Sequence, residues 1–463
     1  MQEWIRKLAE LLGGPIMVWG AAAVGTFLTV KSGFVQIRYF KQSLCHVFGG
    51  LFKKKSEKGV SSFQAVTAAL AGTLGTGNIA GVAAAVFAGG PGAIFWMWIS
   101  AFLGMATKYT EITLAVRHRI RGKNGYIGGP MYYLSAKSGV LFSVLCLLAS
   151  FGAGNIVQSN TAFCAMRALL PNHMLWPHLM MAVAAIATIG ILSGGFGRVA
   201  RVTEKLLPGL AVFYIAGCMA VILLDIPAAG RALLSIFHGA FSFQSAAGGV
   251  GGYLFMRAIR TGCAKGIFTN EAGLGSAPIA HAAANCRYPA EQGLWGIFEV
   301  FFDTIVMCTL TGIVVISANP GGINSEDGVA VTMSAFSNAL GHWSAYLLGF
   351  AVLLFAFASI LAWGSYGAAC ITYLGGTKRA LRRYRMLYGM AVYAGAVLQV
   401  SMVWDLADVL NGMMMLPNLC GLVWLSSEMR EETKHLFVKK SCEKRRKGTL
   451  CMKKSRFQRN TSL

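Results

Sequence analysis

The stretch Gly72-Thr73-Leu74-Gly75-Thr76-Gly77-Asn78-Ile79-Ala80-Gly81 lies inside a long apolar run from Phe63 to Ala88. Four glycines and an asparagine in ten residues are poor helix formers, yet the run is long enough to cross a bilayer, where every backbone polar group needs a partner. A span that unwinds here leaves free N–H and C=O groups at mid-depth, where many secondary transporters bind substrate and sodium. Close packing of helices at small residues is the structural alternative.

The composition around this stretch is that of a polytopic membrane protein. Of 463 residues, 55% are hydrophobic and only 13% are charged, which excludes an ordinary soluble domain. Eleven apolar runs indicate about eleven transmembrane helices and an all-α fold: residues 14–30, 63–88, 91–116, 140–166, 177–194, 207–224, 243–262, 294–317, 343–373, 386–403 and 409–426.

Lysine and arginine fix the expected orientation through their excess in cytoplasmic segments. When segment 31–62 is placed in the cytoplasm and the segments alternate, 36 of these residues fall inside and 3 outside. The N-terminus is therefore predicted outside and the C-terminus in the cytoplasm. The net charge of +23 follows from this bias, so we expect no nucleic-acid partner. The basic tail 427–463 either binds anionic lipid or only reinforces the topology.

A second Gly-rich stretch, Ala246–Gly252, occurs in the seventh run and contains Gly248 and Gly249. The second and seventh runs are five apart in order and cross in opposite directions. Two five-helix repeats of inverted topology give this arrangement, and their broken helices line the substrate site. We therefore predict a second break at Gly248 and Gly249.

Gln158 lies in the fourth run, close to Asn155 and Ser159. Its amide can donate a hydrogen bond to a carboxylate and accept one from an ammonium group. An interhelical hydrogen bond is the alternative role for such a residue.

Acidic residues also occur within the runs. Glu299 and Asp303 are four residues apart in the eighth run, which puts them on one helix face. They could form a proton relay or a cation site. We favour a structural or gating role, with an ion pair to one of the basic residues of the seventh run or the segment after it: Arg257, Arg260 or Lys265. Lys108 and Glu111 are interpreted in the same way.

The motifs of enzymes and of ATP-driven pumps do not occur in this sequence. There is no Ser-His-Asp arrangement, no Gly-x-Ser-x-Gly elbow and no phosphate-binding loop. We therefore expect neither enzymatic activity nor a bound cofactor.

Several ordered segments resemble the alanine or glycine:cation symporter family, also called the sodium:alanine symporter family, along nearly the whole chain. They are Ser32–Arg38, Ser62–Ala65, Gly75–Val82, Gly89–Trp98, Gly128–Tyr133, Asn270–Pro278, Phe298–Thr304, Asp405–Asp408, Asn411-Gly412 and Pro417-Asn418. The resemblance implies a leucine-transporter-like fold with two inverted five-helix repeats, here with one extra N-terminal span. The expected parts are residues 1–62, the first repeat 63–224, the second repeat 243–426 and the tail 427–463.

The resemblance also implies roles for particular residues. Gly75, Thr76, Gly77 and Asn78 would bind the substrate carboxylate, and Gln158 would contact the substrate. Trp363 matches an aromatic wall that limits side-chain size. Thr76 and Ser359 would help to bind sodium. The family usually has a second hydroxyl before Ser359, where this chain has Ala358.

The resulting prediction is a symporter of the cytoplasmic membrane that imports alanine or glycine with sodium as the coupling ion. Its partners would be the amino acid, the ion and the lipid bilayer. Coupling to protons is one alternative. A non-transporting amino-acid sensor of the same fold, which signals through the basic tail, is another.

Overall fold

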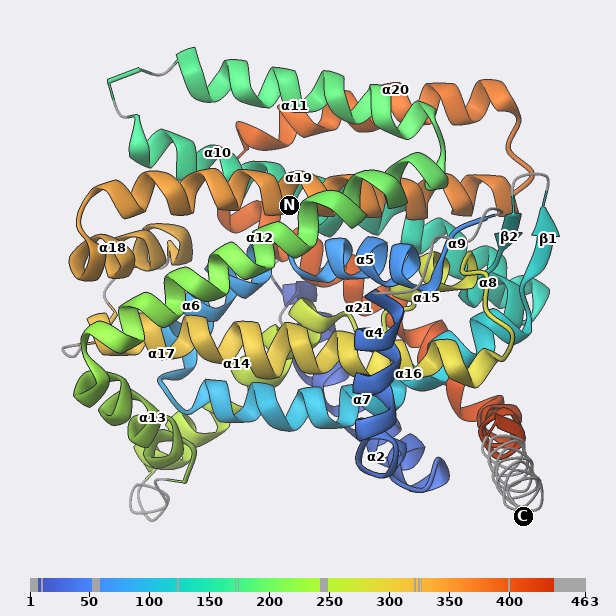
Figure 1. The fold of residues 1–463 in the computed structure, drawn as a ribbon, viewed down its shortest axis with the longest axis horizontal. Helices are drawn as coiled ribbons and strands as arrows, with labels where there is room; N and C mark the ends of the chain where they lie inside the picture. The colour runs from blue at the N-terminus through green and yellow to red at the C-terminus, as the bar shows by residue number, and fades with distance from the viewer. Residues whose placement is uncertain are drawn as a thin grey trace, which may run out of the picture.

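The computed structural model describes residues 7–9, 11–51, 59–122, 125–170, 172–173, 175–241, 249–319, 322–323, 325, 327–398 and 400–436. The described residues are almost entirely helical, and their long helices lie side by side along the longest axis of the molecule (Figure 1). One short antiparallel hairpin, β1 (Ile120–Gly122) with β2 (Gly125–Ile127), lies at one end of this bundle.

The first part of the chain forms the following elements: η1 (Leu12–Ile16), α2 (Met17–Lys31), α3 (Val35–Arg38), α4 (Phe40–Leu51), α5 (Ser62–Thr73), η2 (Thr76–Asn78), α6 (Ala80–Gly89), α7 (Ala93–Arg117), α8 (Pro130–Tyr133), α9 (Ala136–Phe151), η3 (Gly152–Ile156), α10 (Val157–Leu169), α11 (Leu175–Ser193), α12 (Phe196–Leu224) and α13 (Ile226–Phe241).

The second part forms α14 (Gly249–Asn270), α15 (Ala277–Ala282), α16 (Pro289–Val300), η5 (Phe301–Cys308), α17 (Thr309–Ala318), α18 (Gly328–Leu340), α19 (Trp343–Tyr373), α20 (Lys378–Ala396) and α21 (Val400–Trp424). Six helical segments of the described chain are long and apolar enough to cross a membrane. The all-helical prediction is confirmed, and the count of eleven spans stays a prediction. Helices α13 and α18 and the hairpin were not foreseen.

The first predicted break is confirmed. Helix α5 begins with a capping box, in which Ser61 and Gln64 satisfy each other's free backbone N–H groups. The helix ends at Thr73, and Gly75 adopts an extended conformation with φ −111° and ψ −151°. A single 3₁₀ turn, η2, then leads into α6. The apolar run is thus two half-helices joined by an unwound segment.

The second break lies elsewhere than predicted. Helix α14 is continuous from Gly249 to Asn270, and the chain unwinds after it, before α15. Gly249 is at the far end of this 22-residue helix, roughly 30 Å from the break at 1.5 Å per residue. Gly248 lies outside the described residues. The prediction followed the cluster of glycines at the start of the run, and Gly249 is instead the first residue of a continuous helix.

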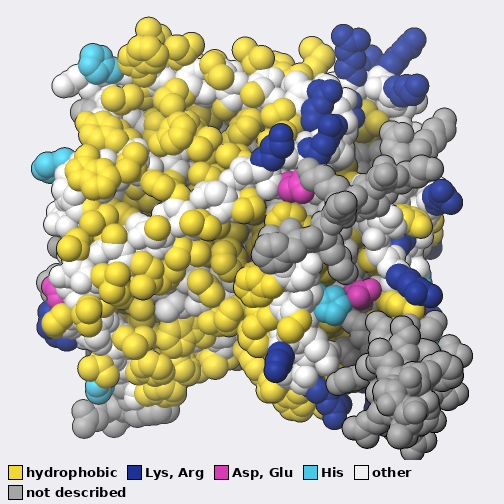
Figure 2. All heavy atoms as spheres, viewed as in Figure 1, with side chains coloured by type: hydrophobic (Ala, Val, Ile, Leu, Met, Phe, Trp, Pro, Cys, Tyr) yellow, Lys and Arg dark blue, Asp and Glu magenta, His cyan; other side chains and the backbone are white. Residues whose placement is uncertain are grey.

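The surface separates apolar from basic side chains. On the face in Figure 2, hydrophobic side chains cover the middle of the helices, and Lys and Arg gather towards the end that carries the β1–β2 hairpin. Residues 426–436 are helical and dock at this end, where Arg117 binds Glu428 at 2.9 Å and Glu432 at 3.0 Å. The tail from Val438 onward lies outside the described residues.

Candidate functional site

The unwound segment after α5 is held by Gln158. The backbone N–H and the hydroxyl of Thr76 both donate to Gln158 Oε1, at 3.1 and 3.0 Å. A Cβ atom at Gly75 would stand 2.8 Å from this oxygen and 2.6 Å from Ser359 Oγ, so only glycine fits there. The π-helical turn η3 precedes Gln158, and such turns often occur at functional sites.

A small cavity opens beside this contact, and Trp363 forms part of its wall. Only about 10 Å³ is open to the centre of a water-sized molecule, room for about one water. The indole packs so closely on Gly154 that any side chain there would clash with it. The described residues lining the cavity come from both breaks, from η3 and α10, and from α19 and α21: Gly72, Thr73, Gly77, Ala153, Gln158, Phe268, Glu271, Leu274, Trp363 and Asn411.

The two predicted sodium ligands lie on either side of Gly75. Ser359 is fully buried and donates to the carbonyl oxygen of Ala71 at 2.7 Å, near the end of α5. The Thr76 hydroxyl points to Gln158. The structure therefore brings a hydroxyl of α19 against the end of the first half-helix.

Asn78 points away from the cavity. Its amide nitrogen donates to the backbone oxygen of Asp303 at 3.1 Å and to the Asp303 carboxylate at 2.8 Å. Asp303 also accepts from the Thr304 hydroxyl at 2.8 Å. Asn78 thus joins the first break to η5, in place of lining the cavity beside Gly77.

The cavity contains a carboxylate that the sequence analysis did not assign. Glu271 follows α14 directly and has a left-handed backbone, with φ 54°, which is uncommon for any residue but glycine. Its Oε1 accepts from Trp363 Nε1 at 2.9 Å, and its Oε2 accepts from the hydroxyl of Ser276. In the sequence, the segment Asn270–Pro278 is distinguished only by its family resemblance. The small residues that follow a long helix there are the one sequence signal that could have indicated an unwound, functional segment.

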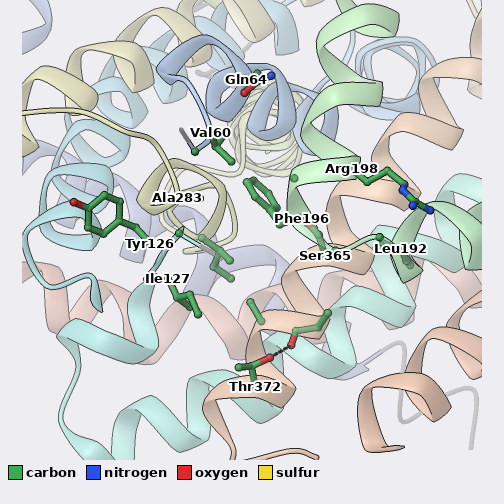
Figure 3. Close-up of a pocket in the computed structure, with 18 of the residues that line it drawn as sticks. Val60, Gln64, Tyr126, Ile127, Leu192, Phe196, Arg198, Ala283, Ser365 and Thr372 are labelled. Carbon is green, nitrogen blue, oxygen red and sulfur yellow. Dashed lines mark hydrogen bonds between the residues drawn. The ribbon is translucent and has the colours of Figure 1, made fainter. Parts of the chain in front are cut away.

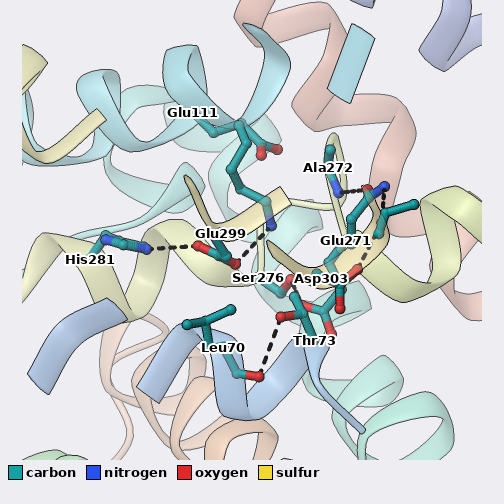
Figure 4. A network of polar contacts seen from close by, with 12 residues as sticks. Leu70, Thr73, Glu111, Glu271, Ala272, Ser276, His281, Glu299 and Asp303 are labelled. Carbon is teal, nitrogen blue, oxygen red and sulfur yellow. Dashed lines mark hydrogen bonds and ion pairs between the residues drawn. The ribbon is translucent and has the colours of Figure 1, made fainter. Parts of the chain in front are cut away.

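A second buried polar network lies next to Glu271 (Figure 4). Glu299 binds Lys108 at 3.4 Å and His281 at 2.9 Å, and all three side chains are fully buried. His281 also contacts Gln292 at 2.8 Å. The structural role favoured for Glu299 is supported, but its partners are on α7 and α15. The predicted pairing with α14 is wrong, because α16 packs its Glu299 face on α7.

Glu111 and Asn418 connect α7 to α21 near the second break. The Asn418 amide donates to Glu111 Oε1 at 2.5 Å and to the backbone oxygen of Gly273 at 2.8 Å, while Tyr133 donates to Asn418 at 2.5 Å. The unwound segment after α14 is therefore anchored through its backbone as well as through Glu271.

A larger vestibule opens at the basic end of the molecule (Figure 3), with a volume of about 650 Å³. It lies between the hairpin, α15, α19 and the start of α12, and its lining includes Gln64, Arg198 and Phe196. Ser365 of α19 lines the vestibule, and Trp363, two residues earlier on the same helix, lines the small cavity.

Comparison with known proteins decides the family. The family model described as "Sodium:alanine symporter family" matches residues 1–449. The chain belongs to the sodium:alanine symporter family. A relative named sodium/alanine symporter AgcS, from Methanococcus maripaludis, is 40% identical over 93% of this chain and 96% of its own length. A probable sodium/glutamine symporter, GlnT of Bacillus subtilis, is 36% identical over 90% and 87%.

The fold agrees with this membership. The chain superposes on MhsT, solved in complex with L-phenylalanine, with a TM-score of 0.56 over 82% of this chain and 99% of that one, at 14% identity. This likeness shows a leucine-transporter-like fold. Membership of the symporter family makes the protein a multi-pass membrane transporter and not an enzyme.

Removing the Lys108 charge should destabilise the protein. Lys108→Met leaves Glu299 buried without its lysine partner, and breaking such a pair costs about 3–5 kcal/mol. Thermal unfolding in detergent should show a clear drop in Tm, with partial recovery in Lys108→Met/Glu299→Gln. Lys137→Met, at an exposed position, should leave Tm nearly unchanged. An unchanged Tm in Lys108→Met would mean that the pair does not stabilise the fold.

Proposed function

We propose that this transporter imports small neutral amino acids, alanine and glycine, with sodium as the coupling ion. The observation that carries the proposal is the cavity between the two broken helices. There Gln158 binds the unwound backbone, and Trp363 forms one wall of the cavity. Free backbone groups at mid-depth suit a zwitterion, because they offer oriented donors and acceptors that water cannot supply there.

The tight cavity supports a small substrate. Trp363 is held on two sides, by its hydrogen bond to Glu271 and by its contact with Gly154, so it cannot move aside without loss of packing. Relatives in the family carry names that specify either alanine or glutamine, so family membership alone does not select the substrate. The fixed indole favours side chains of alanine size or smaller.

The sodium site in this proposal lies between α5 and α19. The carbonyl oxygen of Ala71 and the hydroxyl of Ser359 are within hydrogen-bond distance of each other, and oxygen atoms of this kind suit a hard cation. Thr76 would join them when its hydroxyl leaves Gln158. Ala358 offers no second hydroxyl, so backbone oxygens must supply the remaining ligands.

We further propose eleven spans, with α2 as the extra N-terminal one and two inverted repeats of five. The breaks after α5 and α14 occupy corresponding positions in the two repeats. The gathering of Lys and Arg at the hairpin end (Figure 2) supports a cytoplasmic location for that end. The vestibule there would be the release path into the cytoplasm, with the N-terminus outside.

Uptake by the purified full chain in proteoliposomes tests this function. Labelled alanine should accumulate when a sodium gradient is imposed at equal pH on both sides. Accumulation with a proton gradient alone would support proton coupling. Binding of alanine without accumulation under either gradient would support the sensor.

Replacing Gln158 with leucine should weaken alanine binding. The change removes the amide that binds Thr76 and that faces the cavity. Loss of a hydrogen bond to a charged carboxylate costs roughly 1.5–3 kcal/mol, which is about 10- to 150-fold in affinity. Calorimetry would measure it, with Ser159→Ala as the control on the same helix. An affinity within about threefold of the parent would assign Gln158 to helix packing.

Replacing Trp363 with alanine should broaden the substrate range. The larger cavity should admit larger neutral amino acids while alanine uptake falls, because alanine loses its contacts with the wall. Competition of unlabelled amino acids against labelled alanine gives the profile. Trp343→Ala serves as a matched control, because Trp343 begins the same helix and is exposed. An unchanged profile in Trp363→Ala would contradict the size role.

A further inference from the structure

Glu271 is the one ionisable side chain among the described residues that line the small cavity. It is buried, and its known partners, the indole of Trp363 and the hydroxyl of Ser276, are both neutral. An ionised carboxylate can accept about four hydrogen bonds. Each oxygen of Glu271 therefore has capacity for a further donor, and the negative charge has no cation bound to it.

The buried lysine next to this site, Lys108, is engaged by another residue. Lys108 and His281 both bind Glu299, at 3.4 and 2.9 Å. An ionised carboxylate in a membrane protein is costly unless a cation compensates it. Among the described residues, Glu271 has no ion pair within that network, and its carboxylate lines the cavity with only neutral hydrogen-bond partners.

Two helix ends add to this negative charge. Helix α14 ends at Asn270, directly before Glu271, and α5 ends at Thr73. A Cβ atom placed on Gly72 would lie 3.7 Å from Glu271 Oε2, so the carboxylate lies close to the end of α5. The C-terminal ends of helices carry partial negative charge and favour cations. This side of the cavity is thus built for a positive group.

We infer that Glu271 binds the ammonium group of the amino-acid substrate and so makes the α-amino group a requirement for transport. This rests on the proposed function, in which Gln158 beside the unwound backbone donates a hydrogen bond to the carboxylate of the zwitterion. The ammonium group would then lie towards Glu271, between the ends of α5 and α14. The two broken helices would divide the recognition of the zwitterion between them.

Calorimetry of the purified full chain in sodium buffer tests the inference with three compounds: L-alanine, propionate, which lacks the ammonium group, and ethylamine, which lacks the carboxylate. The parent should prefer alanine strongly. Glu271→Gln should bind alanine about tenfold more weakly or worse, and its preference for alanine over propionate should shrink. Glu111→Gln is the matched control. It alters a buried carboxylate outside the cavity, keeps an oxygen for Asn418, and should bind alanine like the parent.

Each result of these experiments supports or contradicts a different part of the proposal. A parent that binds no alanine overturns the proposed function itself. A folded Glu271→Gln variant that binds alanine within about threefold of the parent overturns only the ammonium role. A loss of sodium-induced thermal stabilisation, with the alanine-to-propionate preference intact, would make Glu271 a sodium ligand and also overturn it. If Glu271→Gln does not fold, Glu271→Asp replaces it, and an unchanged preference there would count against the inference.

Discussion

The hydrogen bond from the Thr76 N–H to Gln158 supports the rest of the site. Where the first broken helix unwinds, its backbone groups lose their helical partners, and the bilayer offers no water to replace them. Gln158 supplies an acceptor from a different helix, and the absence of a side chain at Gly75 lets it approach. The π-helical turn that precedes Gln158 and the close contact of Trp363 with Gly154 lie beside the same break.

The buried acidic side chains differ in whether a cation compensates their negative charge. Glu299 is bound by the buried Lys108 and by the imidazole of His281. The carboxylates of Glu111, Glu271 and Asp303 are bound by neutral amide, hydroxyl or indole donors. The Glu299 network thus has its charge compensated in place and stabilises the packing of α7 against α16. Of the remaining acids, only Glu271 lines the cavity, where a mobile cation can reach it.

Local patterns, the long apolar runs and a glycine-rich interruption, predicted the all-helical architecture and the break at Gly75. The family resemblance, and not a local pattern, placed Gln158 and Trp363 at one site. The second break was misplaced because the glycine cluster near the start of the seventh run was interpreted as an interruption, whereas α14 is a continuous helix from Gly249 to Asn270. The partner of Glu299 was missed because Lys108 lies on a helix far away in the chain, and helical spacing says nothing about such a neighbour. Glu271 owes its position to its left-handed backbone, which the sequence does not display.

If both proposals hold, the hydrogen bond between Trp363 and Glu271 ties size selection to charge recognition. The indole limits the cavity, and its Nε1 also orients the carboxylate that we assign to the ammonium group. A larger substrate must displace the indole, so it would also lose the correctly placed carboxylate. A small substrate would leave both the indole of Trp363 and the carboxylate of Glu271 in place. Discrimination would therefore exceed what steric exclusion alone gives, because a substrate that does not fit leaves a buried polar group unpaired, which is costly in free energy. This coupling accounts for a wall made of tryptophan, where phenylalanine would fill much of the same space without donating a hydrogen bond.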